Sequence, residues 1–202
     1  LKDRGYATGG YGKWGAGGRG STGVPEDHGF DDFFGYYDQV HAHSFYPPYL
    51  IHNSKEVPLA GNDGGRSGQT YSNYEIMKRG LDFIRKNKDR PFFCYFPITP
   101  PHGMYDIPAD DPAFDAYKDD EWFNDPRISQ DVKNYAAMVT MVDNDLQTIL
   151  DLLHELKLED NTIVFFTGDN GGQDRFRSNE YPRGYFVSDE WQSGGFNDGG
   201  TI

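Results

Sequence analysis

Residues 162–166, Thr162-Ile163-Val164-Phe165-Phe166, form an uninterrupted apolar run directly after a long amphipathic segment. The same order occurs earlier, where Phe92-Phe93-Cys94-Tyr95-Phe96 follows a shorter amphipathic segment. Short runs of β-branched and aromatic residues are typical of strands that are buried on both faces of a sheet. Two helix-then-strand units therefore predict an α/β fold, with a mixed, mostly parallel sheet flanked by helices on both faces.

The amphipathic segments predict the two helices of these units. Over residues 71–87, apolar side chains recur at three- and four-residue steps, at Tyr74, Met77, Leu81 and Ile84. From Ser129, a residue type typical of N-caps, a second helix is expected to extend to about Leu156. Its expected apolar face comprises Val132, Tyr135, Ala136, Val139, Val142, Leu146, Ile149, Leu150 and Leu153. Asp143 and Asp145 on this helix are expected at solvent-facing or capping positions.

The remaining segments carry weaker patterns. Short strands are expected at residues 7–13 and within 29–37, and the glycines of residues 6–24 favour a close-packed loop that a ligand can approach. Asn62-Asp63-Gly64-Gly65 favours a hairpin turn. Repeated prolines predict an irregular surface excursion over residues 100–127.

Composition and net charge limit the classes of function that fit this chain. The 202 residues carry 32 Asp and Glu against 19 Lys and Arg, a net charge of -13, which argues against a nucleic-acid partner because phosphate binding needs clustered cations. Only a locally positive pocket in such an acidic body would bind a small anion. The single cysteine, Cys94, excludes an intrachain disulfide and is expected to be an inert buried thiol. No apolar stretch has the length of a membrane span.

Polar residues follow the predicted strands at Lys13, His102, Asp169 and Asn170. In open α/β sheets, ligands bind beyond the carboxyl ends of the strands. Lys13 could clamp an anionic oxygen, His102 could donate a hydrogen bond or act as a general acid, and Asp169 with Asn170 offers the oxygen ligands of Ca²⁺ or Mg²⁺. Each also has a structural interpretation, namely a solvated lysine, a structural loop histidine and a plain Asp-Asn-Gly turn.

Two further groups of side chains are open to alternative interpretations. His41 and His43 lie two residues apart, which on an extended chain puts both on one side, as a site wall or a metal pair. A packed aromatic-rich loop is the structural alternative. The aromatic residues of 45–49 could stack on a sugar ring or could simply pack.

Taken in order, these segments resemble the sulfatase family of the alkaline phosphatase superfamily. Residues 5–14 are similar to its second signature, with a glycine-tyrosine pair, a threonine and then Gly-Lys-Trp. Residues 91–102 resemble the strand and loop that present a catalytic histidine. Residues 135–145 and 161–171 resemble its helix and metal-binding strand. The resemblance covers nearly the whole chain and implies that residues 1–202 are part of one alkaline phosphatase-like catalytic domain, truncated at both ends.

The resemblance implies roles for individual residues. Asp169 and Asn170 would ligate Ca²⁺, in preference to Mg²⁺, Lys13 would contact the sulfate, and His102 would hydrogen-bond the ester or leaving-group oxygen. The family's nucleophile is a formylglycine made from the first residue of a Cys/Ser-x-Pro-x-Arg motif, which this chain does not contain. The nucleophile is therefore expected outside this chain, in the parent protein.

Two other departures from the family pattern matter. Many members have a histidine directly after Lys-Trp, where this chain has Gly15, and His43, or failing that His41, is the predicted replacement. A second sulfate-binding lysine in a Gly-Gly-Lys segment has no counterpart after residue 186.

The resulting prediction is a sulfuric ester hydrolase, acting on a sulfated small molecule or sugar, with the remaining part of the parent sulfatase as partner. The resemblance is also compatible with a periplasmic, secreted or lysosomal location. The alternatives are a phosphoester or phosphonate hydrolase of the same superfamily and a catalytically inactive structural fragment.

Overall fold

The computed structural model describes residues 1–102 and 104–170. Its strands are β1 (Ala7–Lys13), β2 (Asp32–Tyr36), β3 (Tyr49–His52), β4 (Lys55–Pro58) and β5 (Phe92–Tyr95). Its α-helices are α1 (Ser72–Lys86), α2 (Glu121–Asn124) and α3 (Gln130–Glu155). Short 3-10 turns are η1 (Lys2–Arg4), η2 (Pro25–His28), η3 (His41–His43), η4 (Pro112–Ala116) and η5 (Glu159–Asn161).

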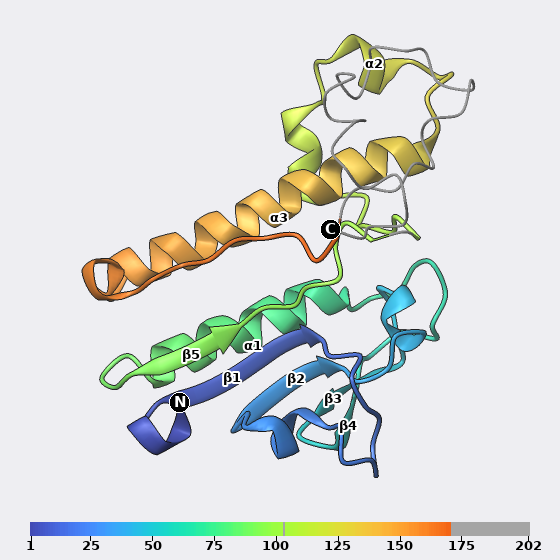
Figure 1. Cartoon of the computed structure of the whole chain (residues 1–202). Helices are drawn as coiled ribbons and strands as arrows, with labels where there is room; N and C mark the ends of the chain where they lie inside the picture. The colour runs from blue at the N-terminus through green and yellow to red at the C-terminus, as the bar shows by residue number, and fades with distance from the viewer. Residues whose placement is uncertain (103, 171–202) are drawn as a thin grey trace.

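The strands form one sheet in the order β4-β3-β2-β1-β5, so β1 lies between two parallel neighbours (Figure 1). The β3 and β4 strands extend the sheet as an antiparallel hairpin. The predicted mixed α/β sheet is thus confirmed. Because β2, β1 and β5 run in the same direction, their carboxyl ends meet at one edge, where polar residues following these strands can form a site.

Helix α1 covers one face of the sheet and explains the periodicity of its sequence. Its buried side chains include Ile76, Met77, Phe83 and Ile84. Ile76 and Phe83 join the main core with strand residues such as Tyr11. Tyr74 of the predicted stripe is 43% exposed, so the buried face is rotated toward Ile76. The helix ends at Lys86, where the Asn87 side chain donates to the Phe83 carbonyl.

Helix α3 packs at both ends on different partners. Its first half buries Ala137, Met138 and Met141 against Tyr105 and Ile107 of the proline-rich excursion. The excursion is therefore anchored by its own core. The second half of α3 packs Leu152 and Leu153 against α1 and the side chains of β5 that face α1. The predicted face of α3 is offset by about one position, since Val139 and Leu150 are each 40% exposed.

The hairpin turn spans residues 52–55, ten residues earlier than the predicted turn at residues 62–65. β3 and β4 pair antiparallel with His52 opposite Lys55, and Asn53 and Ser54 form the two-residue turn with φ of 44° and 65°. Positive φ at both central residues matches the twist of a tight hairpin. Residues 62–65 instead form a loop, in which Gly64 N–H donates to the Tyr46 carbonyl.

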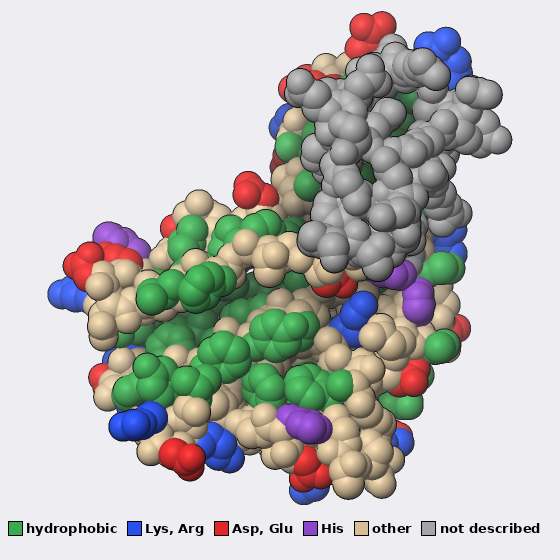
Figure 2. Space-filling view, viewed as in Figure 1, with side chains coloured by type: hydrophobic (Ala, Val, Ile, Leu, Met, Phe, Trp, Pro, Cys, Tyr) green, Lys and Arg blue, Asp and Glu red, His purple; other side chains and the backbone are tan. Residues whose placement is uncertain are grey.

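Residues 162–166 are not a strand of this sheet, contrary to the prediction. No backbone hydrogen bond joins them to any other part of residues 1–102 and 104–170. Ile163, Phe165 and Phe166 are 80%, 87% and 67% exposed. The predicted burial of β5 on both faces is also wrong, since Phe93 and Tyr95 are 40% and 46% exposed. One face of the described sheet thus lacks a covering helix layer at β5, and Figure 2 shows apolar side chains gathered there.

None of the helices in residues 1–102 and 104–170 combines the length and apolar character that crossing a membrane requires.

Asp145 is half-buried between α3 and α1, whereas Asp143 is exposed as predicted. The Asn73 side-chain amide donates to Asp145 Oδ2 over 2.8 Å. Burial, together with the nearby Asp111 carboxylate, raises the pKa of Asp145 from 3.8 to about 6. The charged carboxylate therefore destabilises the fold at neutral pH.

Replacement Asp145→Asn should stabilise the chain at pH 8. Because the folded-state pKa is raised, stability falls as pH rises from about 4 to about 6, and the full cost is present above that window. Asn accepts the same hydrogen bond without charge, so the free energy of unfolding should rise by on the order of 1–3 kcal/mol at pH 8, with little difference at pH 3.5. Urea unfolding at both pH values measures this. The exposed Asp143→Asn is the control, and an equal effect of both variants would contradict the assignment.

Candidate functional site

The carboxyl end of β1 is held in place by both neighbouring strands. Lys13 N–H donates to the Pro97 carbonyl after β5, over 2.7 Å. On the other side, Trp14 and Gly15 donate to the carbonyls of Tyr36 and Tyr37, over 2.8 and 3.1 Å. The backbone that carries Lys13 is thus fixed from two sides.

Glycine is required at the position before Lys13. Gly12 has a φ of 144°, and a Cβ atom there would lie 2.2 Å from the Pro97 carbonyl oxygen. The contact lets the segment after β5 lie directly against β1. At Gly12 the close approach is made by a neighbouring segment of the protein, whereas the approach of a ligand to the glycines of residues 6–24 stays a prediction.

Lys13 is a half-buried cation at the end of this central strand. None of the ion pairs within residues 1–102 and 104–170 involves its ammonium group. A lysine without a neighbouring carboxylate can accept an anion without first breaking a salt bridge.

His43 and His102 come together, although 59 positions separate them in the sequence. Their ring centroids are 4.9 Å apart and the rings are nearly perpendicular, at 75°. His43 ends η3, which follows β2, and His102 lies in the loop that follows β5. Because β2 and β5 flank β1, this contact joins the segments that follow the two neighbours of the strand that ends at Lys13.

The turn that carries His43 is held by Asp38. Its Oδ1 accepts hydrogen bonds from the N–H groups of Val40 and His41, over 2.8 and 3.0 Å. An Asp that satisfies these otherwise unpaired amides stabilises the start of a helical turn. The sequence analysis did not predict this role, although Asp side chains commonly accept a hydrogen bond from the backbone two residues on.

His41 and His43 do not form a pair, contrary to one of the predicted interpretations. In the 3-10 turn, residues two apart point in different directions. His41 packs between the rings of Tyr36 and Tyr49, with centroids at 5.1 and 4.6 Å, and burial lowers the pKa of its imidazole. The part of the chain that the structure describes holds no group of three His, Cys, Asp or Glu side chains suited to a metal.

The aromatic residues of 45–49 are packed inside the protein. Phe45 and Tyr46 are 1% and 5% exposed and contact Tyr71. Their packing leaves no open face of either ring for a sugar, so the structural alternative is correct for these two residues.

Asp169 and Asn170 are exposed and follow the extended segment of residues 162–166. Asn170 N–H donates to Asp169 Oδ1 over 2.9 Å. This local hydrogen bond uses one carboxylate oxygen of Asp169 and is compatible with a plain turn. The arrangement supplies two neighbouring oxygen donors, and their role as calcium ligands stays a prediction.

Two further residues near the strand ends were not predicted. Thr99 is 6% exposed and, within the described residues, its hydroxyl has no hydrogen-bond partner. Its carbonyl accepts the N–H of His102, so Thr99 shapes the loop that carries this histidine. Gln39 lies against Gly15, where a Cβ atom would be 2.2 Å from its Nε2. The sequence gives no local signal for either contact, because both depend on loops meeting at the sheet edge.

Comparison with known proteins identifies this architecture. The family model described as Sulfatase matches residues 1–194. The chain belongs to the sulfatase family.

Curated relatives of this sulfatase chain include an uncharacterized sulfatase, YdeN, of Escherichia coli (strain K12), 31% identical over 79% of the chain and 28% of the relative. The N-acetylgalactosamine-6-sulfatase of Canis lupus familiaris is 29% identical over 85% of the chain and 31% of the relative. The chain thus spans about a third of the length of these relatives.

Among solved structures, Ps i-CgsB in complex with k-i-k-neocarrahexaose is similar to the sulfatase chain with a TM-score of 0.65 and 27% identity. The match covers 83% of this chain and 38% of that one. The predicted family and fold class are therefore confirmed.

Replacement Gly12→Ala should destabilise the chain and disturb the end of β1. The new methyl group collides with the Pro97 carbonyl, and the backbone angle is unfavourable for alanine, so we expect a loss on the order of 2–4 kcal/mol in the free energy of unfolding. Gly18→Ala is the control, because nothing lies within 4 Å of a Cβ atom there. Urea unfolding compares the two. Equal stability of the two variants would show that the strand end tolerates a side chain.

Proposed function

We propose that the protein containing this chain hydrolyses sulfate esters and that Lys13, His43 and His102 belong to its active site. The observation that supports this most directly is the contact between His43 and His102, which lie after the two neighbours of the strand that ends at Lys13. It brings two imidazoles together at the edge of the sheet where β1 ends in Lys13 and where ligands bind in this class of fold. Family membership favours a sulfate ester over a phosphoester as the substrate.

In this proposal each side chain has a defined task. Lys13 binds a sulfuryl oxygen as a point charge and offsets negative charge that builds up as the ester bond breaks. His102 donates a hydrogen bond to the leaving-group oxygen, and its proton can be transferred to that oxygen as it departs. His43 orients the His102 ring through the perpendicular contact between them.

Gly15 explains how His43 takes the place of the histidine that many family members have after Lys-Trp. With no side chain at residue 15, Gln39 lies directly over the backbone there. The turn of residues 38–43 can therefore approach the end of β1. Gly15 also has a φ of 74°, a backbone angle that disfavours histidine, so the imidazole is proposed to come from the adjacent turn.

A metal ion and a nucleophile complete the proposed machinery. Asp169 and Asn170 have the donor chemistry of a hard cation, and they fit as two of the 6–8 oxygens that Ca²⁺ takes, so the other ligands come from elsewhere. When bound, Ca²⁺ would polarise the sulfuryl oxygens as a Lewis acid. The nucleophile is proposed to be a formylglycine outside residues 1–202.

The proposed substrate is a sulfated sugar. The relatives include proteins named as an N-acetylgalactosamine-6-sulfatase and an endo-4-O-sulfatase of Bacteroides thetaiotaomicron, and a similar structure is complexed with a neocarrahexaose. A sulfated sugar is also compatible with the acidic body, because one sulfate group needs only a local cation.

The first test is turnover of an aryl sulfate by the protein with its native flanking sequence. Lys13→Ala and His102→Ala should each lower kcat/KM by at least about 100-fold, because each removes a group that acts on the transition state. Lys55→Ala, at an exposed position of β4, is the matched control for Lys13. The 202-residue chain alone should show no turnover. Full activity of Lys13→Ala, or turnover by the isolated chain, would contradict the assignment.

The second test is calcium-dependent thermal stability. Calcium should raise the Tm of the longer protein, since a ligand at 100 times its Kd adds about 2.7 kcal/mol to the native state. Asp169→Ala should abolish most of that increase, whereas Asp160→Ala, in the exposed turn after α3, should not. In the 202-residue chain two donors alone should give no measurable shift. A shift that persists in Asp169→Ala would place the ion elsewhere.

A further inference from the structure

The segment of residues 104–106, which begins two positions after His102, contains a strained residue. Tyr105 has a φ of 51°, in the left-handed region that bulky side chains rarely adopt. Its side chain is 1% exposed and its ring packs against Tyr135 of α3, so the strained residue is anchored in the core. Such conformations persist where the surrounding contacts over-determine them, and they are frequent at functional sites.

Side chains from three other parts of the fold hold the backbone of this segment. All three carbonyls of residues 104–106 accept a side-chain hydrogen bond. The donors, in order along the segment, are Arg66, Asn134 and Tyr71, over 2.8, 2.8 and 3.0 Å. They come from the connection between β4 and α1, from α3, and from the residue before α1. The chain that follows the His102 loop therefore has a fixed path.

Arg66 makes the largest number of these contacts. Besides the Met104 carbonyl, its guanidinium binds Asp106 Oδ1 through Nε over 2.8 Å and Asp131 Oδ1 through Nη2 over 3.0 Å. Asp106 is 6% exposed, and burial raises the pKa of its carboxyl while Arg66 lowers it. The planar fork of a guanidinium can bind a carbonyl and two carboxylates at once, whereas an ammonium group is a point charge. Arg66 thus ties the segment after His102 to the first turn of α3.

The connection that carries Arg66 is also bound to the turn of His43. The Gly64 carbonyl accepts a hydrogen bond from Ser44 Oγ over 3.4 Å, and Ser44 directly follows His43. The base of this connection is closed by the Asn62 side chain, which makes four hydrogen bonds to backbone groups. One loop therefore contacts both of the segments that present the two imidazoles.

We propose that Arg66 is a positioning residue, which holds His102 in its contact with His43 by fixing residues 104–106 against α3. The inference rests on the proposed function, because a role in the reaction requires that His102 acts on the leaving group. Arg66 acts through the backbone of the loop. Without it, the strained Tyr105 can relax and the His102 loop can shift. A misplacement of about 1 Å can lower the rate of a reaction by about 100-fold.

Imidazole NMR signals test the positioning without relying on turnover. In the protein with its native flanking sequence, Arg66→Gln should shift the ring signals of His102 and, through the ring contact at 4.9 Å, those of His43. The shift is expected because each ring lies in the magnetic field of the other. Unchanged His102 signals in a folded Arg66→Gln protein would overturn the proposal.

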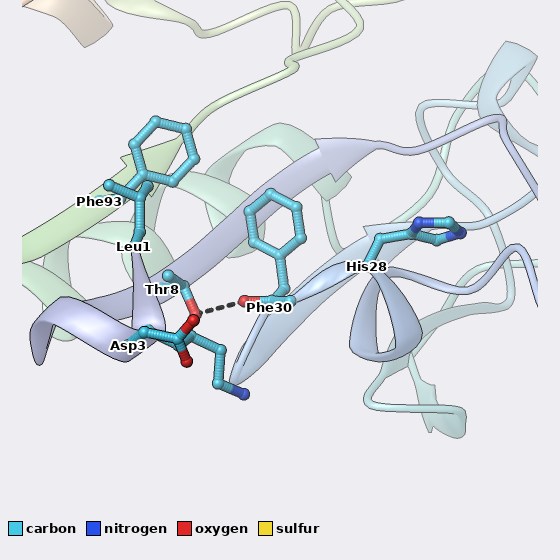
Figure 3. Close-up of a pocket in the computed structure, with 8 residues that line it drawn as sticks. Leu1, Asp3, Thr8, His28, Phe30 and Phe93 are labelled. Carbon is cyan, nitrogen blue, oxygen red and sulfur yellow. Dashed lines mark hydrogen bonds between the residues drawn. The ribbon is translucent and has the colours of Figure 1, made fainter.

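Two controls show whether the change is local. His28 lines a hollow of about 340 Å³ with Phe30 and Phe93, and its signals should not move (Figure 3). Arg85→Gln is the matched variant, because Arg85 is 50% exposed, against 56% for the side chain of Arg66, and also pairs with a carboxylate. If Arg85→Gln shifted the His102 signals equally, the effect would be a general one and the proposal would be wrong.

Turnover of an aryl sulfate, measured below the Tm of each variant, provides the catalytic arm. Arg66→Gln should lower kcat by about 10-fold or more and change KM by less than about twofold, because orientation of the leaving-group donor acts on the transition state. Arg66→Lys keeps a positive charge beside Asp106, so it should retain the Tm, yet its kcat should stay low. Wild-type kcat in either variant would refute the positioning role, and in Arg66→Lys it would show that charge alone suffices.

Asn134→Ala is the second variant, and it decides the matter if the Arg66 variants fail to fold. It releases the Tyr105 carbonyl without leaving a buried carboxylate unpaired. The His102 signals should again shift, and kcat should fall by about 3- to 10-fold. The absence of any His102 shift in this variant would count against the proposal. A protein that shows the expected His102 shifts yet fails to cleave sulfate esters would support the positioning and contradict only the proposed function.

Discussion

The close contact of β1 with its two parallel neighbours is the constraint on which the structure depends. A Cβ atom at Gly35 would lie 1.9 Å from the Gly12 carbonyl, and one at Gly12 would lie 2.2 Å from the Pro97 carbonyl. Backbone thus meets backbone on both sides of the strand, just before Lys13. The loops after β2 and β5 are consequently brought to the end of β1, and the contact of His43 with His102 follows from this geometry.

The sequence predicted those elements whose signals are local. Strand β1 and helix α1 were predicted within one residue at each end. The helix prediction rested on a side-chain periodicity that reflects burial against a neighbouring layer, whereas β1 was predicted from its place in the glycine-rich segment. The hairpin was misplaced because two glycines at 64 and 65 suggested a turn, whereas Asn53 and Ser54 form it with positive φ. Tertiary packing selects among such turns, and a local pattern does not contain that information.

The candidate site was predictable to a similar extent. Position after a strand indicated Lys13 and His102, and family resemblance suggested His43. The orientation of His41 into the core could not be predicted without knowing that residues 41–43 form a 3-10 turn. The burial of Phe45 and Tyr46 depends on the distant Tyr71 and on α3. The order of strands in the sheet brings such pairs together, and single-sequence patterns do not specify that order.

Residues 162–166 show how a strand pattern and an unpaired conformation can occur in the same segment. Apolar, β-branched composition describes the environment that a segment requires, and it does not provide the neighbouring strand. Within residues 1–102 and 104–170, the exposed Phe165 and the outer edge of β5, which has no strand partner there, both show that composition alone does not supply a neighbour. The end of β1 is the opposite case, because neighbouring segments on both sides of Lys13 and Trp14 accept their backbone N–H groups and fix the strand end.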